Sequence, residues 1–93
     1  MVWIDVEIYN WTANLTANRE FITKLVSQLK KRNAVIGVYT SERDWRHIVG
    51  LDWTNLHELP LWYSHFDNNP TFSDFLPFGG WTKPSIKQYS PDV

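Results

Sequence analysis

The sequence predicts an α/β fold in which about four mostly parallel strands alternate with two helices. Residues 2–9 alternate apolar and polar side chains, the period of a strand. Residues 17–32 place apolar side chains three and four positions apart, the spacing of an amphipathic helix. Residues 34–39 form a short apolar run of the kind that parallel sheets bury on both faces. Because strands and helices alternate along the chain, parallel pairing is favoured.

The first predicted strand has two distinct faces. One face is apolar and β-branched and consists of Val2, Ile4, Val6 and Ile8. The other carries two aromatic rings and two carboxyl groups, on Trp3, Asp5, Glu7 and Tyr9. If the apolar face packs against helices, the second face points into a barrel or cleft. An isolated antiparallel sheet would produce the same alternation with the acids in water.

The first predicted helix has signals for both of its ends. Thr16 is a suitable N-cap, and Asn33 can adopt the left-handed conformation that closes a helix. We expect one stripe of this helix to face the core, formed by Phe21, Ile22, Leu25, Val26 and Leu29. Ser41, with Asp44 three residues later, resembles a capping box in which Asp stands in place of Glu. A second, short helix is therefore expected after Ser41, ending at Gly50.

Two further strands are predicted in the second half of the chain. Residues 61–66 form one, entered through Pro60, and residues 85–89 form the last. The segment 67–84 between them is rich in Asn, Pro, Gly and aromatic residues, so we expect an ordered loop. His47, His57 and His65 have no mutual spacing typical of a metal site, so we expect ordinary histidines.

Composition restricts the classes of function. The 93 residues suit a single domain, residues 1–93, and contain no cysteine for disulfides. Nine basic residues against ten acidic ones leave a net charge of −1, which predicts no partner among nucleic acids or membrane surfaces. The N-terminal residues lack the features of a signal peptide, and no apolar run is long enough for a membrane span. Aromatic residues make up 16% of the chain, which suits either a packed core or a carbohydrate groove.

Asp5 and Glu7 are the candidate catalytic pair. At positions i and i+2 of a strand they point to the same side, with Cα atoms roughly 6.6–7 Å apart. Glycoside hydrolysis needs two carboxyl groups near one sugar, one of which stays protonated to donate to the leaving oxygen. Trp3 and Tyr9 on the same face would supply an apolar wall that raises the pKa of one carboxyl. The alternative is an exposed strand face with two solvated acids.

Five blocks, in order, resemble glycoside hydrolase family 25, the Chalaropsis-type lysozymes, and most closely their invertebrate and protist branch. The blocks are residues 2–7, 37–41, 60–63, 77–81 and 87–89. The resemblance implies an incomplete (β/α) barrel corresponding to the C-terminal half of a TIM-like barrel. It also implies cleavage of the β-1,4 bond between N-acetylmuramic acid and N-acetylglucosamine in peptidoglycan, with no metal or organic cofactor.

The resemblance also implies roles for individual residues. Glu7 matches the acid/base, and Asp5 matches the carboxylate that orients or stabilises the 2-acetamido group of the substrate as it attacks the anomeric carbon. Tyr39 and Trp62 match aromatic residues that line the groove, and Gln88 matches a block at the start of the last strand. With Trp3 and Tyr9, these residues form the expected substrate-binding set.

The family pattern has two more active-site aspartates, on the first barrel strand and near the end of the last, and neither is matched here. A complete barrel needs about 200–250 residues, so we expect this chain to correspond to half of one. Half a barrel exposes a strand edge on each side, which predicts self-association or association with another chain. The parent protein is expected to be secreted or to reside in a lysosome or phagosome.

Two other readings remain open. The chain could be a catalytically inactive fragment that binds glycans or regulates, or it could derive from another barrel glycosidase with a D-x-E motif, such as a chitinase. Asn10 and Asn14 each begin an N-glycosylation sequon.

Overall fold

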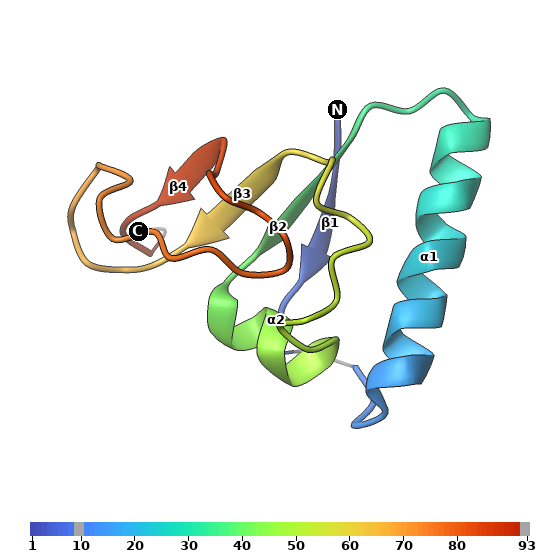
Figure 1. Cartoon of the computed structure of the whole chain (residues 1–93). Coiled ribbons are helices and arrows are strands. Elements are labelled where there is room, and N and C mark those ends of the chain that lie inside the picture. The colour runs from blue at the N-terminus through green and yellow to red at the C-terminus, as the bar shows by residue number, and fades with distance from the viewer. Residues whose placement is uncertain (9–10, 92–93) are drawn as a thin grey trace.

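Four parallel strands and two helices make up the fold within the described residues, 1–8 and 11–91, of a computed structural model (Figure 1). This confirms the predicted fold class. The elements follow one another as β1 (Val2–Val6), α1 (Leu15–Lys31), β2 (Ile36–Thr40), α2 (Glu42–Ile48), β3 (Leu61–Ser64) and β4 (Ile86–Gln88). Helix α1 runs opposite to the strands, and α2 lies at the carboxyl ends of β1 and β2 (Figure 1).

The order of the strands in the sheet is their order in the sequence, β1-β2-β3-β4, and every pair is parallel. The register aligns Asp5 with Tyr39, and Tyr39 with Trp62. It also aligns Ser64 with Gln88. Side chains at aligned positions share a face, so residues from all four strands gather on each side of the sheet. This arrangement is consistent with part of a barrel.

The predicted apolar face of β1 is confirmed only in its middle. Ile4 and Val6 are buried in the core, whereas Val2 and Ile8 are exposed. The strand also ends at Val6, three residues earlier than the alternating pattern suggested. A pattern of period two reports which residues can face a core, but the covering elements decide how many of them do.

Helix α1 begins two residues earlier than predicted, and its N-cap is Asn14 rather than Thr16. The Asn14 side chain accepts a hydrogen bond from the backbone N–H of Ala17 at 3.1 Å. The predicted left-handed Asn33 is confirmed, with a φ of 58°, and the N–H of Ala34 returns to the carbonyl of Leu29. The prediction of Thr16 is therefore wrong, because the helix begins one half-turn earlier and Asn14 takes the capping position.

The core-facing stripe of α1 is narrower than predicted. Ile22 and Val26 are buried, and Leu25 and Leu29 pack partly against the core. Phe21 was expected on the same stripe, but it is 59% exposed and makes an edge-on contact with Trp11 at 5.8 Å. Phe21 therefore lies at the margin of the stripe, and its ring contacts Trp11 and not the buried core.

Helix α2 begins as predicted after Ser41, whose side chain accepts a hydrogen bond from the N–H of Asp44 at 3.1 Å. Its Trp45 is fully buried and packs against Trp53 at 5.7 Å and Trp81 at 4.9 Å between ring centroids. These three rings fill the space beneath the sheet, so half of the six tryptophans serve the core.

Within the described residues no helix covers the opposite face of the sheet, which carries the rings of Trp3, Tyr39 and Trp62. Trp3 lies over Gly37, its register partner on β2. A Cβ added at Gly37 would come within 2.4 Å of the Trp3 ring, so only glycine leaves room for this arrangement. Trp3 in turn contacts Trp62 edge-on at 5.6 Å. Gly37 thus sets how closely the aromatic residues lie on the sheet.

Lys87 on β4 holds the loop between β3 and β4 in place. Its side chain is only 2% exposed, and its ammonium group contacts the carboxylates of Asp67 at 2.9 Å and Asp74 at 2.7 Å. The ammonium also donates to the backbone carbonyls of Asn69 and Thr71. Partial burial of Asp74 alone would raise its pKa, but hydrogen bonds from Lys87, Tyr63 and His65 outweigh it and lower the pKa to about 2.

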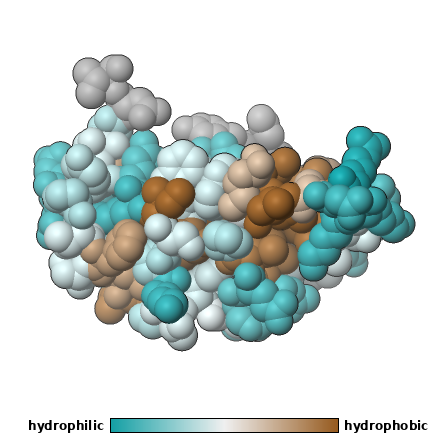
Figure 2. All heavy atoms as spheres, turned by 90° about the horizontal axis from the view of Figure 1, so that it is seen from above, coloured by the Kyte–Doolittle hydropathy of each residue, from teal (hydrophilic) through white to brown (hydrophobic). Residues whose placement is uncertain are grey.

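On the face of the molecule that Figure 2 shows, hydrophobic atoms lie in separate patches among hydrophilic ones. Such a mixed surface is ordinary for a folded protein. Among the large hydrophobic residues that are described, Leu76 is the most exposed, at 77%, and Phe66 is 55% exposed. Both lie in the region where the strands end.

The contact between Trp3 and Gly37 predicts that substitutions at these two positions have strongly coupled effects on the free energy of unfolding. Gly37→Ala should destabilise the protein by about 1–3 kcal/mol, because the new methyl group forces the Trp3 ring away from the sheet. In a Trp3→Ala background the same change should cost far less. Urea unfolding of the two single variants and the double variant measures this coupling, and equal costs in both backgrounds would contradict it.

The Lys87 cluster predicts a loss of stability that depends on pH. Ionised Asp74, with its pKa lowered from 3.8 to about 2, stabilises the fold above pH 3.8, and this contribution disappears as the pH falls toward 2. Lys87→Met should therefore be less stable than the wild type at pH 7, and the difference should narrow between pH 3.8 and 2. Urea unfolding across this range tests it, with exposed Lys83→Met as the control. A gap independent of pH would show that the ammonium group is not the stabilising partner.

Candidate functional site

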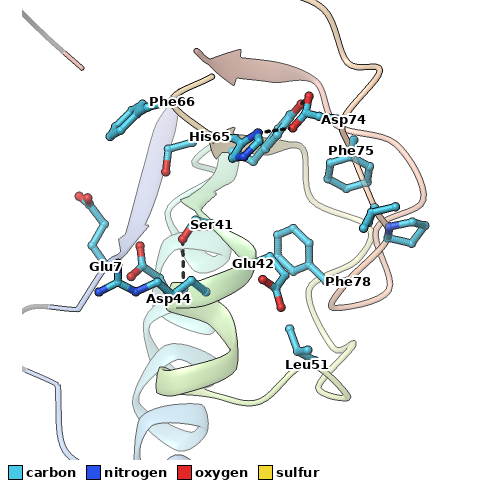
Figure 3. A pocket seen from close by; sticks show the side chains of 15 residues that line it. Glu7, Ser41, Glu42, Asp44, Leu51, His65, Phe66, Asp74, Phe75 and Phe78 are labelled. Carbon is cyan, nitrogen blue, oxygen red and sulfur yellow. Dashed lines mark hydrogen bonds and ion pairs between the residues drawn. The ribbon is translucent and has the colours of Figure 1, made fainter. Parts of the chain in front are cut away.

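A groove with a volume of about 760 Å³ lies where the parallel strands end (Figure 3). Glu7 enters it just after β1, Ser41 just after β2, and His65 just after β3. Its apolar wall comes from the loop between β3 and β4 and includes Phe75, Leu76, Pro77 and Phe78. In parallel α/β folds the carboxyl ends of the strands are the usual place for active sites.

Glu7 is a carboxyl group in the groove whose acidity is strongly altered. Its pKa is raised from the ordinary 4.5 to about 7, first by partial burial, then by a hydrogen bond with Asp5 and by the negative charges of Asp5 and Asp44. A carboxyl group with this pKa is partly protonated at neutral pH. It can therefore donate a proton under conditions in which an ordinary carboxylate cannot.

Asp5 lies on β1 beside Glu7, but in a different environment. Asp5 is exposed, and its register partner is Tyr39 on the uncovered face of the sheet. Asp5 does not line the groove, whereas Glu7 does. The two carboxyl groups therefore meet at the boundary between the groove and the uncovered sheet face.

Four of the predicted substrate-binding residues lie together on that sheet face. Trp62 contacts Trp3 at 5.6 Å and Tyr39 at 4.6 Å between ring centroids. The Tyr39 hydroxyl donates a hydrogen bond to the side-chain carbonyl of Gln88. These residues form a continuous surface beside Asp5, rather than lining the groove itself. Tyr9, the fifth predicted residue, lies outside the described residues.

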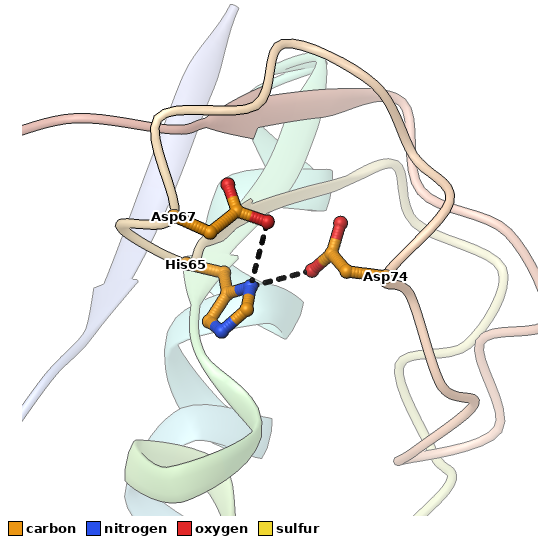
Figure 4. Close-up of side chains that lie close together, drawn as sticks. All are labelled: His65, Asp67 and Asp74. Atoms are coloured by element: carbon orange, nitrogen blue, oxygen red, sulfur yellow. Dashed lines mark hydrogen bonds and ion pairs between the residues drawn. The ribbon is translucent and has the colours of Figure 1, made fainter.

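The structure adds two features that the sequence patterns did not reveal. Asp44 contributes to the raised pKa of Glu7 from the first turn of α2. In addition, His65 Nδ1 lies 2.7 Å from a carboxylate oxygen of Asp74 and 3.4 Å from one of Asp67 (Figure 4). The predicted ordered loop between β3 and β4 was the only signal for this cluster, because loop folding and not sequence spacing brings its members together.

The cluster of His65, Asp67 and Asp74 has the ligand types of a metal site. One potential ligand atom from each residue lies within 4.8 Å of the others. However, the Lys87 ammonium group already bonds to both carboxylates. Because a lysine supplies the positive charge at the centre of the cluster, the arrangement fits an ion-pair network better than a divalent cation.

In the part of the chain that the structure describes, no helix has both the length and the apolar character that crossing a membrane requires. No solved structure matches the chain significantly. The model of the family described as lysozyme-like protein 1 matches residues 1–89, almost the whole sequence.

Several relatives share the sequence over almost its whole length. The probable GH family 25 lysozyme 2 of Dictyostelium discoideum is 49% identical over 96% of this chain and 42% of its own length. Lysozyme-like protein 5 of Caenorhabditis elegans is 42% identical over 96% of this chain and 41% of its own length. Counting factor 50 of D. discoideum is 43% identical over 96% of this chain and 30% of its own length.

This chain thus spans less than half the length of these relatives. The family model and the relatives agree with one another, and they agree with the ordered sequence blocks around Asp5 and Glu7. The chain belongs to the lysozyme-like proteins of glycoside hydrolase family 25.

Proposed function

We propose that this chain carries the acid/base half of a muramidase active site, which cleaves β-1,4 bonds in peptidoglycan or a related amino-sugar polysaccharide. The observation that carries the proposal is Glu7, a carboxyl group with a pKa of about 7 at the carboxyl end of a parallel strand. Asp5 is its partner. Two neighbouring carboxyl groups in different environments are the usual basis for dividing acid and stabilising roles.

In this mechanism protonated Glu7 donates its proton to the glycosidic oxygen as the bond to the anomeric carbon breaks. The electron pair of that bond leaves with the oxygen, and the oxygen of the 2-acetamido group forms a new bond to the anomeric carbon. Asp5 holds the acetamido N–H during this attack. Glu7, now a carboxylate, then takes a proton from the water molecule that attacks the anomeric carbon. As the bond to water forms, the bond between that carbon and the acetamido oxygen breaks, which restores the acetamido group and completes hydrolysis.

The uncovered sheet face is the proposed extension of the binding site. The rings of Trp3, Tyr39 and Trp62 offer apolar surface beside Asp5, which suits the apolar faces of sugar rings. Gln88 adds an amide to the same surface. We place Tyr9, which follows Glu7 in the sequence, in the same role.

The biological setting is part of the proposal. We place the parent protein outside the cell or in a lysosome or phagosome, where it would serve antibacterial defence or digestion without a cofactor. Residues 1–93 would act as one partial catalytic domain. Strands β1 and β4 each pair on one side only among the described residues, which leaves two edges for self-association or for a second chain.

A second candidate function is glycan binding without catalysis. It is favoured by the rings of Trp3, Tyr39 and Trp62, which form an aromatic surface on the uncovered sheet face, outside the groove that Glu7 lines. This surface could retain a sugar polymer without any contribution from Glu7. Peptidoglycan pull-down by the chain without release of reducing ends would support this candidate over the first.

The assignment of the acid predicts that Glu7→Gln abolishes activity. Glutamine keeps the shape of the side chain but cannot donate the proton, so the release of reducing ends from purified peptidoglycan should fall by a factor of at least about 100. Retention of the chain on insoluble peptidoglycan should change little. A Glu7→Gln variant as active as the wild type would exclude Glu7 as the acid.

The raised pKa of Glu7 predicts the pH dependence of hydrolysis. Because the protonated form is the active one, the rate should decline as the pH rises through about 7. Asp5→Asn removes a negative charge next to Glu7, so its pKa should fall and this decline should begin at a lower pH. Asp44→Asn should shift the decline in the same direction by less, since its charge is the smallest of the causes.

The two aspartate variants separate the effect of a neighbouring charge on the pKa of Glu7 from a direct role in the reaction. Asp5→Asn should also lower the maximal rate, because it removes the group that holds the acetamido N–H. Asp44→Asn should leave the maximal rate close to that of the wild type. A pH profile that neither variant moves would contradict the proposed coupling between Glu7 and its acidic neighbours.

A further inference from the structure

His65 occupies a position in the groove that the proposed mechanism does not use. It follows β3 directly and lines the same groove as Glu7, which follows β1 (Figure 3). Its side chain is 56% exposed, so it is accessible from solvent. Phe66, the next residue, also lines the groove and is 55% exposed. A polar ring and an apolar ring therefore stand side by side in the sequence at the carboxyl end of a strand.

The orientation of the His65 ring is fixed from one side. Nδ1 lies 2.7 Å from Asp74, and Asp74 is itself held by Lys87 at 2.7 Å and by the Tyr63 hydroxyl at 2.9 Å. Because Asp74 carries a negative charge and can only accept, the His65 Nδ1 atom bears the proton. Nε2 points away from both carboxylates in Figure 4. Asp74 thus determines the tautomer of the His65 ring. The second ring nitrogen, Nε2, is left available to a ligand.

We propose that His65 is a substrate-binding residue of the groove and that Asp74 is the residue that positions it. This inference rests on the proposed function, since the ligand is an amino-sugar polymer. In the neutral ring Nε2 accepts a hydrogen bond from a sugar hydroxyl, and in the protonated ring it donates one to a carbonyl or ether oxygen. Phe66, which also lines the groove, offers a flat apolar face to the same polymer.

The arrangement differs from a purely structural histidine. A histidine that only tied the loop to β3 would need no free nitrogen toward the groove, and Lys87 already anchors this loop through Asp67 and Asp74. Loss of the His65 ring therefore leaves the main anchor of the loop in place. The variants below should separate binding from folding for that reason.

The probe for this inference is tetra-N-acetylchitotetraose, a soluble amino-sugar oligomer. In the 93-residue chain labelled with ¹⁵N-histidine, adding the probe should shift the Nε2 resonance of His65. The Nδ1 resonance should stay that of a protonated nitrogen. His47, whose Nδ1 contacts a backbone carbonyl of its own helix, is outside the groove and should not respond.

Variants provide the second measurement. His65→Ala should raise the Kd for the probe about tenfold, the effect of one lost hydrogen bond to a polar ligand. His65→Gln, whose amide nitrogen reaches roughly the place of Nε2, should keep part of the affinity. Asp74→Asn should weaken binding because it no longer selects the tautomer. His47→Ala, at an exposed helix position, is the matched control and should bind like the wild type.

The outcomes separate this inference from the proposed function. If the wild-type chain binds the probe while the His65 resonances stay still, or if His65→Ala binds equally well, the role of His65 is wrong and the proposed function stands. If the wild-type chain does not bind the probe at all, both are overturned. The resonance shift needs no variant, so the test remains decisive even if a substitution prevents folding.

Discussion

The ammonium group of Lys87 is the interaction on which the functional end of this fold depends. It comes from the last strand, yet it bonds to two carboxylates and two carbonyls of the preceding loop. That loop supplies the apolar wall of the groove, and its Asp74 holds the His65 ring. This nearly buried cation thus links the sheet, the groove wall and His65. The links persist because a buried ammonium group without partners would cost much free energy.

The molecule separates two kinds of chemistry across the plane of its sheet. Below the sheet, Trp45, Trp53 and Trp81 provide packing. On the uncovered side, Trp3 and Trp62 lie beside Asp5 and are accessible to a ligand. The same residue type therefore packs the core in one place and remains partly exposed in another. Glu7 lies where the groove meets this surface, which is why burial and charge both act on its pKa.

The sequence alone could predict much of this fold because its signals are local. Alternation in β1, the stripe of α1 and the caps at Ser41 and Asn33 each depend on a few neighbouring residues. The cap at Asn14 and the exposure of Phe21 escaped prediction because they depend on which elements cover the helix. The uncovered face was foreseen through Asp5, Glu7 and the family resemblance.

The groove itself could not be predicted in detail. Its outer wall is an irregular loop of roughly twenty residues, whose path is set by contacts with Lys87 and not by a periodic pattern. From the sequence we therefore predicted an ordinary histidine at His65, and we assigned Asp44 only to a capping motif. Both become relevant to chemistry through contacts between segments that sequence spacing does not encode.

The strand order β1-β2-β3-β4, identical to the order in the sequence, has a consequence for synthesis on the ribosome. Each strand can add to the edge that the previous one has just formed, so the sheet grows from one side as the chain emerges. Lys87 belongs to β4, the last of the four strands to be synthesised. The groove wall, which Lys87 anchors, is therefore fixed only after β4 has joined the other three strands.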